Sequence, residues 1–166
     1  MLRITCRFAA TLVALAAGAG PLQAQLPGES VTKGIASLRG EFLAVTYEEV
    51  QATLLDWALA VERGDTAKIR PLLSQETWFS PVEGWRALDP EETLVKLAEW
   101  LPTVSAYGFT VNDFDASSSL AYVLGSVHYQ RRVGDEGKVV RAEVALVLAR
   151  RGDRWQVRSY LERPIP

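Results

Sequence analysis

The chain has only one cysteine, one histidine and one methionine among its 166 residues. The cysteine, Cys6, lies in an N-terminal segment that has the features of a cleaved export signal, so the mature protein would have no disulfide and no thiol. One histidine and no mature cysteine leave carboxylates as the main metal ligands, and no carboxylate spacing resembles a calcium loop. We therefore expect no bound metal and a fold that is held together by packing.

The motifs of common catalytic and nucleotide-binding sites are also missing. No serine lies in a nucleophile-elbow motif, and His128 is the single histidine that could act as the base of a catalytic triad. The sequence has no glycine-rich phosphate loop and no dinucleotide fingerprint. We expect no bound cofactor.

Basic residues are too few for binding to nucleic acid. Lysine and arginine number 18 against 20 aspartate and glutamate, which gives a net charge of -2. Loss of Arg3 and Arg7 with the N-terminal segment would leave 16 basic against 20 acidic residues, and no basic stripe. Neither nucleic acid nor an acidic membrane is therefore expected as a partner.

Residues 1–24 have the order of a secretory signal peptide. Arg3 and Arg7 give a positive start, an apolar run follows over residues 8–20, and Ala24 is a small residue at the cleavage position. The run is shorter than the roughly 20 apolar residues of a transmembrane helix, and an uncleaved anchor is the alternative interpretation. We expect cleavage near Ala24, a periplasmic or secreted protein without membrane association, and a mature chain of about 140 residues in one domain.

The next segment, residues 25–45, contains proline and glycine without a sustained period, which predicts a linker or a loosely attached N-terminal arm. The domain proper is expected over residues 46–166. Thr46 and Glu49 form a capping box, which predicts a helix that begins there and ends at Gly64. Shorter helices are predicted after Asp65 and from Asp89, with an extended piece at residues 76–81 between them.

Strand patterns dominate the rest of the chain, with strands predicted at residues 105–114, 120–132, 138–150 and 155–161. Gly152 and Asp153 form the centre of the last hairpin turn, so that Leu148 faces Val157. A four-residue loop in the preceding hairpin makes Val127 face Val144. These registers give one apolar face and one mixed face.

The helices precede a meander of strands, which predicts an α+β fold. Three segments resemble the SnoaL-like branch of the nuclear transport factor 2-like superfamily: Arg63-Gly64-Asp65, Trp78-Phe79-Ser80-Pro81 and Gly152-Asp153-Arg154-Trp155-Gln156-Val157. The resemblance covers residues 46–161. It implies a curved antiparallel sheet wrapped around about three helices, in a cone with an apolar pocket. Members include ketosteroid isomerases, polyketide cyclases, dehydratases and binding or assembly domains without chemistry.

Enzymes of this superfamily use an acid or a histidine in the apolar pocket as a general base. The short strand at residues 78–81 has neither, and Ser159-Tyr160 stand where SnoaL-like sequences often have histidine. Asp56 and Asp113 are the weak catalytic candidates, with Glu83 in a loop. We therefore expect an exported domain that binds a small apolar ligand or a partner. The alternatives are an isomerase or cyclase with a pocket acid, and a periplasmic assembly or interaction module.

Aromatic side chains are predicted to line the pocket and suit a flat apolar ligand. The predicted set is Trp57, Trp78, Trp85, Phe109, Tyr129 and Trp155.

The mixed face of the sheet has an apolar centre and a charged rim, which predicts a homodimer. The predicted dimer face is Tyr122, Leu124, His128, Glu143, Val147 and Tyr160. In this register His128 lies opposite Glu143, with Glu162 on the next strand.

Overall fold

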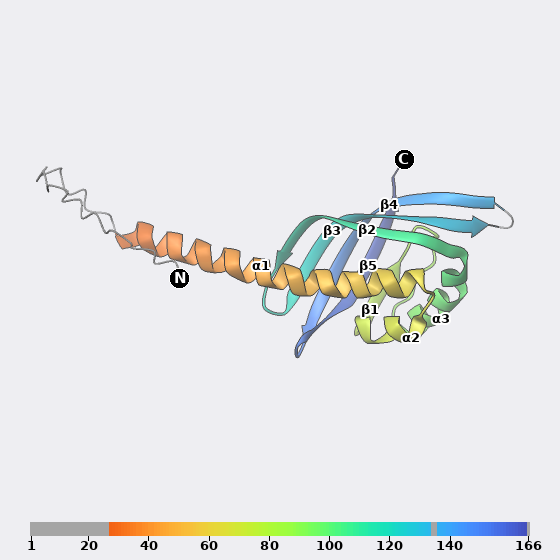
Figure 1. Ribbon diagram of the computed structural model, residues 1–166. Coiled ribbons are helices and arrows are strands. Elements are labelled where there is room, and N and C mark those ends of the chain that lie inside the picture. The colour runs from red at the N-terminus through yellow and green to blue at the C-terminus, as the bar shows by residue number, and fades with distance from the viewer. Residues whose placement is uncertain (1–26, 134–135, 166) are drawn as a thin grey trace, which may run out of the picture.

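The computed structural model describes residues 27–133 and 136–165, and within them three α-helices pack on one face of a five-stranded sheet (Figure 1). The elements in order are α1 (Pro27–Glu62), α2 (Thr66–Ile69), η1 (Arg70–Leu72), β1 (Leu73–Ser80), α3 (Pro90–Trp100), η2 (Leu101–Thr103), β2 (Val104–Ala116), β3 (Leu120–Val133), β4 (Glu136–Arg151) and β5 (Arg154–Pro164). The sheet curves around α1, and α2 and α3 lie near the C-terminal end of that helix (Figure 1). The predicted α+β class is confirmed.

Helix α1 begins at Pro27, well before the predicted start at Thr46. The segment predicted as a linker or arm is therefore helical from Pro27 onward, and its first turns extend beyond the sheet (Figure 1). Glycine within a helix costs only about 1 kcal/mol relative to alanine, so Gly34 and Gly40 do not end it. The predicted capping box is not formed, because Thr46 lies within the helix, and the carboxylate of Glu49 binds side chains of the sheet.

The strands have the order β1-β5-β4-β3-β2. Strands β2 to β5 form the predicted antiparallel meander, while β1 pairs with β5 in parallel. The sheet is therefore mixed, which corrects the prediction of a wholly antiparallel one. Parallel pairing of β1 is feasible because two helices and three strands separate it from β5 along the chain.

The β3–β4 hairpin is tighter than predicted, with Val133 paired to Glu136. Val127 consequently lies opposite Ala142, two positions from the predicted Val144. A shift by two preserves which face each side chain occupies. It does change the cross-strand partners: His128 lies opposite Arg141, and Ser126 opposite Glu143. The predicted His128–Glu143 pair is therefore wrong.

The β4–β5 hairpin begins in the predicted register and then changes. Leu148 faces Val157 as predicted, but beyond a bulge Val147 faces Ser159. One extra residue in β5 turns every later side chain to the opposite face. Tyr160 is therefore 1% exposed and lies in the interior, not on the predicted dimer face.

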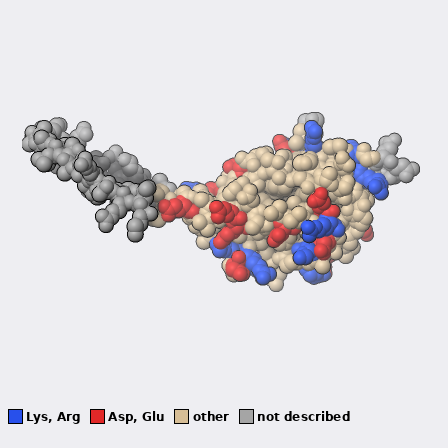
Figure 2. All heavy atoms as spheres, viewed as in Figure 1, with Lys and Arg blue, Asp and Glu red and all other residues tan. Residues whose placement is uncertain are grey.

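The core lies between the inner face of the sheet and the helices. Val127, Leu148 and Val157 from the sheet pack with Trp57 of α1 and Leu97 of α3 in one apolar cluster. None of the described helices has an apolar segment long enough to cross a bilayer. On the face seen in Figure 2, acidic and basic side chains are interspersed around α1, and neither sign forms a continuous stripe.

Candidate functional site

The most unusual group in the interior is the carboxyl of Glu162, which the β5 bulge directs inward. Its Oε2 accepts a hydrogen bond from the backbone N–H of Val82 at 2.9 Å, and its Oε1 accepts one from the hydroxyl of Tyr160. Burial raises the pKa of Glu162 to about 6, although these hydrogen bonds favour the ionised form and oppose the shift. Glu162 is therefore a carboxyl that exchanges its proton near neutral pH.

Two tyrosine hydroxyls extend this arrangement into the core. The hydroxyl oxygens of Tyr107 and Tyr160 are 3.2 Å apart. Because Tyr160 donates to Glu162, Tyr107 is the donor to Tyr160. Burial raises the pKa of both tyrosines well above the ordinary value, so both remain protonated at neutral pH. The three groups form a hydrogen-bonded chain, Tyr107–Tyr160–Glu162.

A second buried acid, Glu83, lies in the loop between β1 and α3. Its side chain is 6% exposed, and its Oε1 accepts hydrogen bonds from the Tyr129 hydroxyl at 2.9 Å and from Trp100 Nε1 at 3.0 Å. Arg131 NH1 lies 3.4 Å from the same oxygen. The negative charge of Glu83 also contributes to the raised pKa of Glu162, so the two acids are neighbours in the interior.

Aromatic rings form the wall next to this chain. Phe79 stacks on Tyr160 with ring centroids 4.3 Å apart, and Trp85 stacks on Phe79 at 5.3 Å. Trp57 of α1 packs against both of these rings, with centroids 5.7 Å from Tyr160 and 5.7 Å from Phe79. The interior therefore combines flat apolar surfaces with hydroxyl and carboxyl groups.

The structure places some of the predicted pocket residues at the interior and others outside it. Trp57, Trp85 and Tyr129 border the interior chain, and Phe109 packs partly buried against the core. Trp78 is 45% exposed on β1 and faces solvent, so it lies outside the interior. Trp155 is buried, but its Nε1 donates to Glu49 of α1, and it lines a separate cleft on the outer side of that helix.

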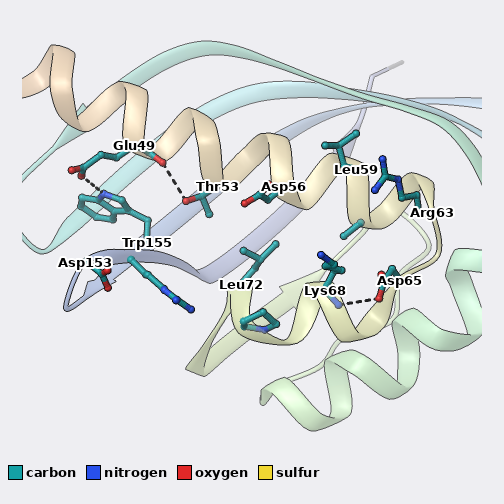
Figure 3. Close-up of a pocket in the computed structure, with 13 residues that line it drawn as sticks. Glu49, Thr53, Asp56, Leu59, Arg63, Asp65, Lys68, Leu72, Asp153 and Trp155 are labelled. Atoms are coloured by element: carbon teal, nitrogen blue, oxygen red, sulfur yellow. Dashed lines mark hydrogen bonds between the residues drawn. The ribbon is translucent and has the colours of Figure 1, made fainter.

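Neither weak catalytic candidate lies in the interior. Asp56 is exposed and lines the same outer cleft (Figure 3). Asp113 is exposed on β2, where its carboxylate accepts a hydrogen bond from Tyr122 at 3.4 Å. The interior acids are Glu83, which sequence analysis left among the loop candidates, and Glu162, which it assigned to the outer face. The alternation of apolar and polar residues along a strand does not reveal the bulge that turns Glu162 toward the interior.

On the outer face of the sheet, Tyr122, Leu124 and Val147 are 41%, 45% and 36% exposed. Glu143 binds Arg163 there.

Within the residues that the structure describes, no group of three or more histidine, cysteine, aspartate or glutamate side chains is placed to hold a metal ion.

No protein-family model matches the sequence, and no curated protein matches it significantly. Solved structures do match the fold. A candidate scytalone dehydratase from Novosphingobium aromaticivorans has a TM-score of 0.67 at 13% identity, over 74% of this chain and 86% of that one. A ketosteroid isomerase-like protein from Erwinia carotovora atroseptica has a TM-score of 0.63 at 13% identity, over 72% and 95%. An uncharacterised protein with a cystatin-like fold from Caulobacter vibrioides also scores 0.63, at 8% identity, over 72% and 89%.

The domain therefore has the cystatin-like α+β cone fold of nuclear transport factor 2-like proteins, as the sequence resemblance predicted.

Proposed function

We propose that the interior of the cone binds a small, flat, mostly apolar molecule with one polar oxygen, and that Glu162 exchanges a proton with it. The observation that carries this proposal is the buried chain Tyr107–Tyr160–Glu162 beside stacked aromatic rings. Two structures with the same fold are named for an isomerase-like protein and a candidate dehydratase, which supports proton-transfer chemistry.

The chemistry follows from the protonation states of the chain. With a pKa of about 6, Glu162 is mainly ionised at neutral pH and acts as a general base. Each tyrosine hydroxyl already donates within the chain, so the Tyr160 hydroxyl turns from Glu162 to the ligand oxygen, on which negative charge develops, as Glu162 takes up the proton. The aromatic wall excludes water and strengthens both effects. The reaction class is removal of a proton next to a carbonyl or hydroxyl group.

A flat ketone with exchangeable protons, 2-tetralone, provides a direct test. In deuterated buffer the protein should accelerate deuterium uptake next to the carbonyl, followed by proton NMR, with a rate that rises through a pH of about 6 as Glu162 ionises. Glu162→Gln should lower the accelerated rate by about 10²–10⁴-fold. Glu143→Gln, on the outer face, is the matched control and should keep the full rate.

Saturable binding of 2-tetralone without accelerated exchange would leave the interior as a binding site without chemistry. Neither binding nor exchange would contradict the proposal and favour an interaction module of the same fold.

The proposal includes a homodimer through the outer face of the sheet, centred on Tyr122, Leu124 and Val147. Their partial exposure on one face is the feature that supports it. Val147→Glu should place a charge in the centre of the interface and yield monomers in sedimentation velocity experiments at micromolar concentration. Val139→Glu is the control, because Val139 is 59% exposed near the end of β4, away from these residues. A wild-type monomer under these conditions would contradict the dimer.

Export is proposed from the sequence, since residues 1–26 lie outside the described part of the chain. N-terminal sequencing of the exported protein should find a new terminus near Gln25. Recovery of intact Met1 in a membrane pellet would show an anchor instead.

A further inference from the structure

A cleft of about 490 Å³ lies on the outer side of α1, apart from the interior chain (Figure 3). One wall is the face of α1 from Glu49 to Ala60, continued by Arg63 just after the helix, and the other is formed by α2 and η1. The β4–β5 turn with Trp155 closes one end. The volume lies within the range of about 300–1,000 Å³ typical of ligand pockets.

The cleft has an apolar middle and charged rims. Leu59, Ala60 and Leu72 contribute the apolar surface. Two of the acids at the rim are already engaged: Glu49 binds Trp155 and Arg150, and Asp65 accepts a hydrogen bond from the backbone N–H at position 68. These two acids therefore stabilise the fold of the walls.

Five other charged side chains line the cleft, of which Asp153 and Arg154 stand at its closed end, by the β4–β5 turn. Asp56, Arg63 and Lys68 form no ion pair with any residue in the described part of the chain. Arg63 directly follows α1 and comes seven residues after Asp56, which corresponds to about two helical turns and a rise of about 10 Å. Lys68 lies across the cleft on α2, at the same end of the cleft as Arg63 (Figure 3). A free anion and two free cations thus occupy different positions along one apolar groove.

We propose that this cleft binds a short peptide of about three residues by its two charged ends. An extended chain spans about 3.3–3.6 Å per residue, so the termini of a tripeptide match the separation of Asp56 from Arg63. The amino terminus lies against Asp56, and the carboxylate lies between Arg63 and Lys68, as charge-assisted hydrogen bonds. The apolar middle of the cleft takes the central side chain. This activity is independent of the interior site.

The test uses the tripeptide Ala-Leu-Ala in three forms: free, N-acetylated and C-amidated. Isothermal titration calorimetry with the full-length mature protein should show that the free form binds, and that each block weakens binding by about tenfold or more. Asp56→Asn should weaken binding of the free form to the same extent, and acetylation should then have no further effect. Lys68→Gln should reproduce the effect of amidation in the same way.

Asp113→Asn and Lys138→Gln are the matched controls, since both remove a charge outside the cleft and should leave affinity unchanged. Equal affinity for all three peptide forms, or no binding of the free form at millimolar concentration, would overturn the proposal. Loss of peptide binding in Glu162→Gln would also overturn it, because the peptide would then occupy the interior. Retained binding in Glu162→Gln supports a separate site.

Discussion

Replacing Trp155 with alanine should lower the free energy of unfolding by about 3–5 kcal/mol, as is typical for a fully buried aromatic residue. The ring is 2% exposed, and Arg150 lies over it at 5.6 Å. Its Nε1 donates to Glu49 Oε2 at 3.0 Å, which fixes α1 against the end of β5. The substitution therefore removes buried area and the contact between two layers. Urea unfolding followed by far-ultraviolet circular dichroism measures the loss.

Trp78→Ala is the matched control, because it makes the same substitution in a tryptophan that is 45% exposed. Its loss should be under about 1 kcal/mol. Equal losses at the two positions would contradict the placement of Trp155. Trp155→Phe isolates the hydrogen bond, and it should cost about 1 kcal/mol beyond the change in packing.

The second large effect concerns Glu162 and the pH. Its pKa of about 6 in the folded protein lies above the ordinary 4.5, so the folded state holds the proton more tightly than the unfolded state. The resulting stabilisation is fully present below pH 4.5 and is lost as the pH rises through 6. The contribution of Glu162 to the free energy of unfolding should therefore fall by about 2 kcal/mol from pH 4.5 to pH 7. Urea titrations at the two pH values measure this loss.

The glutamine in Glu162→Gln cannot ionise, so this variant should lack that part of the pH dependence. Its free energy of unfolding should therefore fall less than that of wild type between pH 4.5 and pH 7. Glu143→Gln, whose carboxylate is exposed on the outer face, should retain the wild-type dependence. A Glu162→Gln protein with the full wild-type pH dependence would show that the carboxyl is not buried.

Local signals were sufficient for much of the fold. The alternation of apolar residues and the glycine at the β4–β5 turn predicted the meander, and Gly152 has the positive φ of 62° that such a turn requires. Asp89 followed by Pro90 predicted the start of α3, where the Asp89 carboxylate accepts from the N–H of Glu92. The inner face of β3 and of β4 followed from the period of two, even though the β3–β4 register was shifted by two positions.

The features that sequence analysis missed depend on tertiary contacts. Pairing of Phe79 with Tyr160 joins residues far apart in the chain, and no local pattern specifies that it is parallel. The bulge after Val157 changes the direction of Tyr160 and Glu162 without a glycine or proline to mark it. For this reason the sequence placed Trp57, Trp85 and Tyr129 at the interior but missed Tyr160 and the acid beside it.

The position of β1 also has a consequence for how the protein is made. β1 lies at one edge of the sheet, and its partner β5 is the last of the five described strands in sequence order. During synthesis β1 emerges early, and apart from the bridge between Phe79 and Ala87 its backbone has no partner until β5 has left the ribosome. Pairings of such high contact order form slowly, and an unpaired strand edge is prone to aggregation in the meantime. The sheet is therefore completed only after β5 has left the ribosome, whatever the other strands have formed by then.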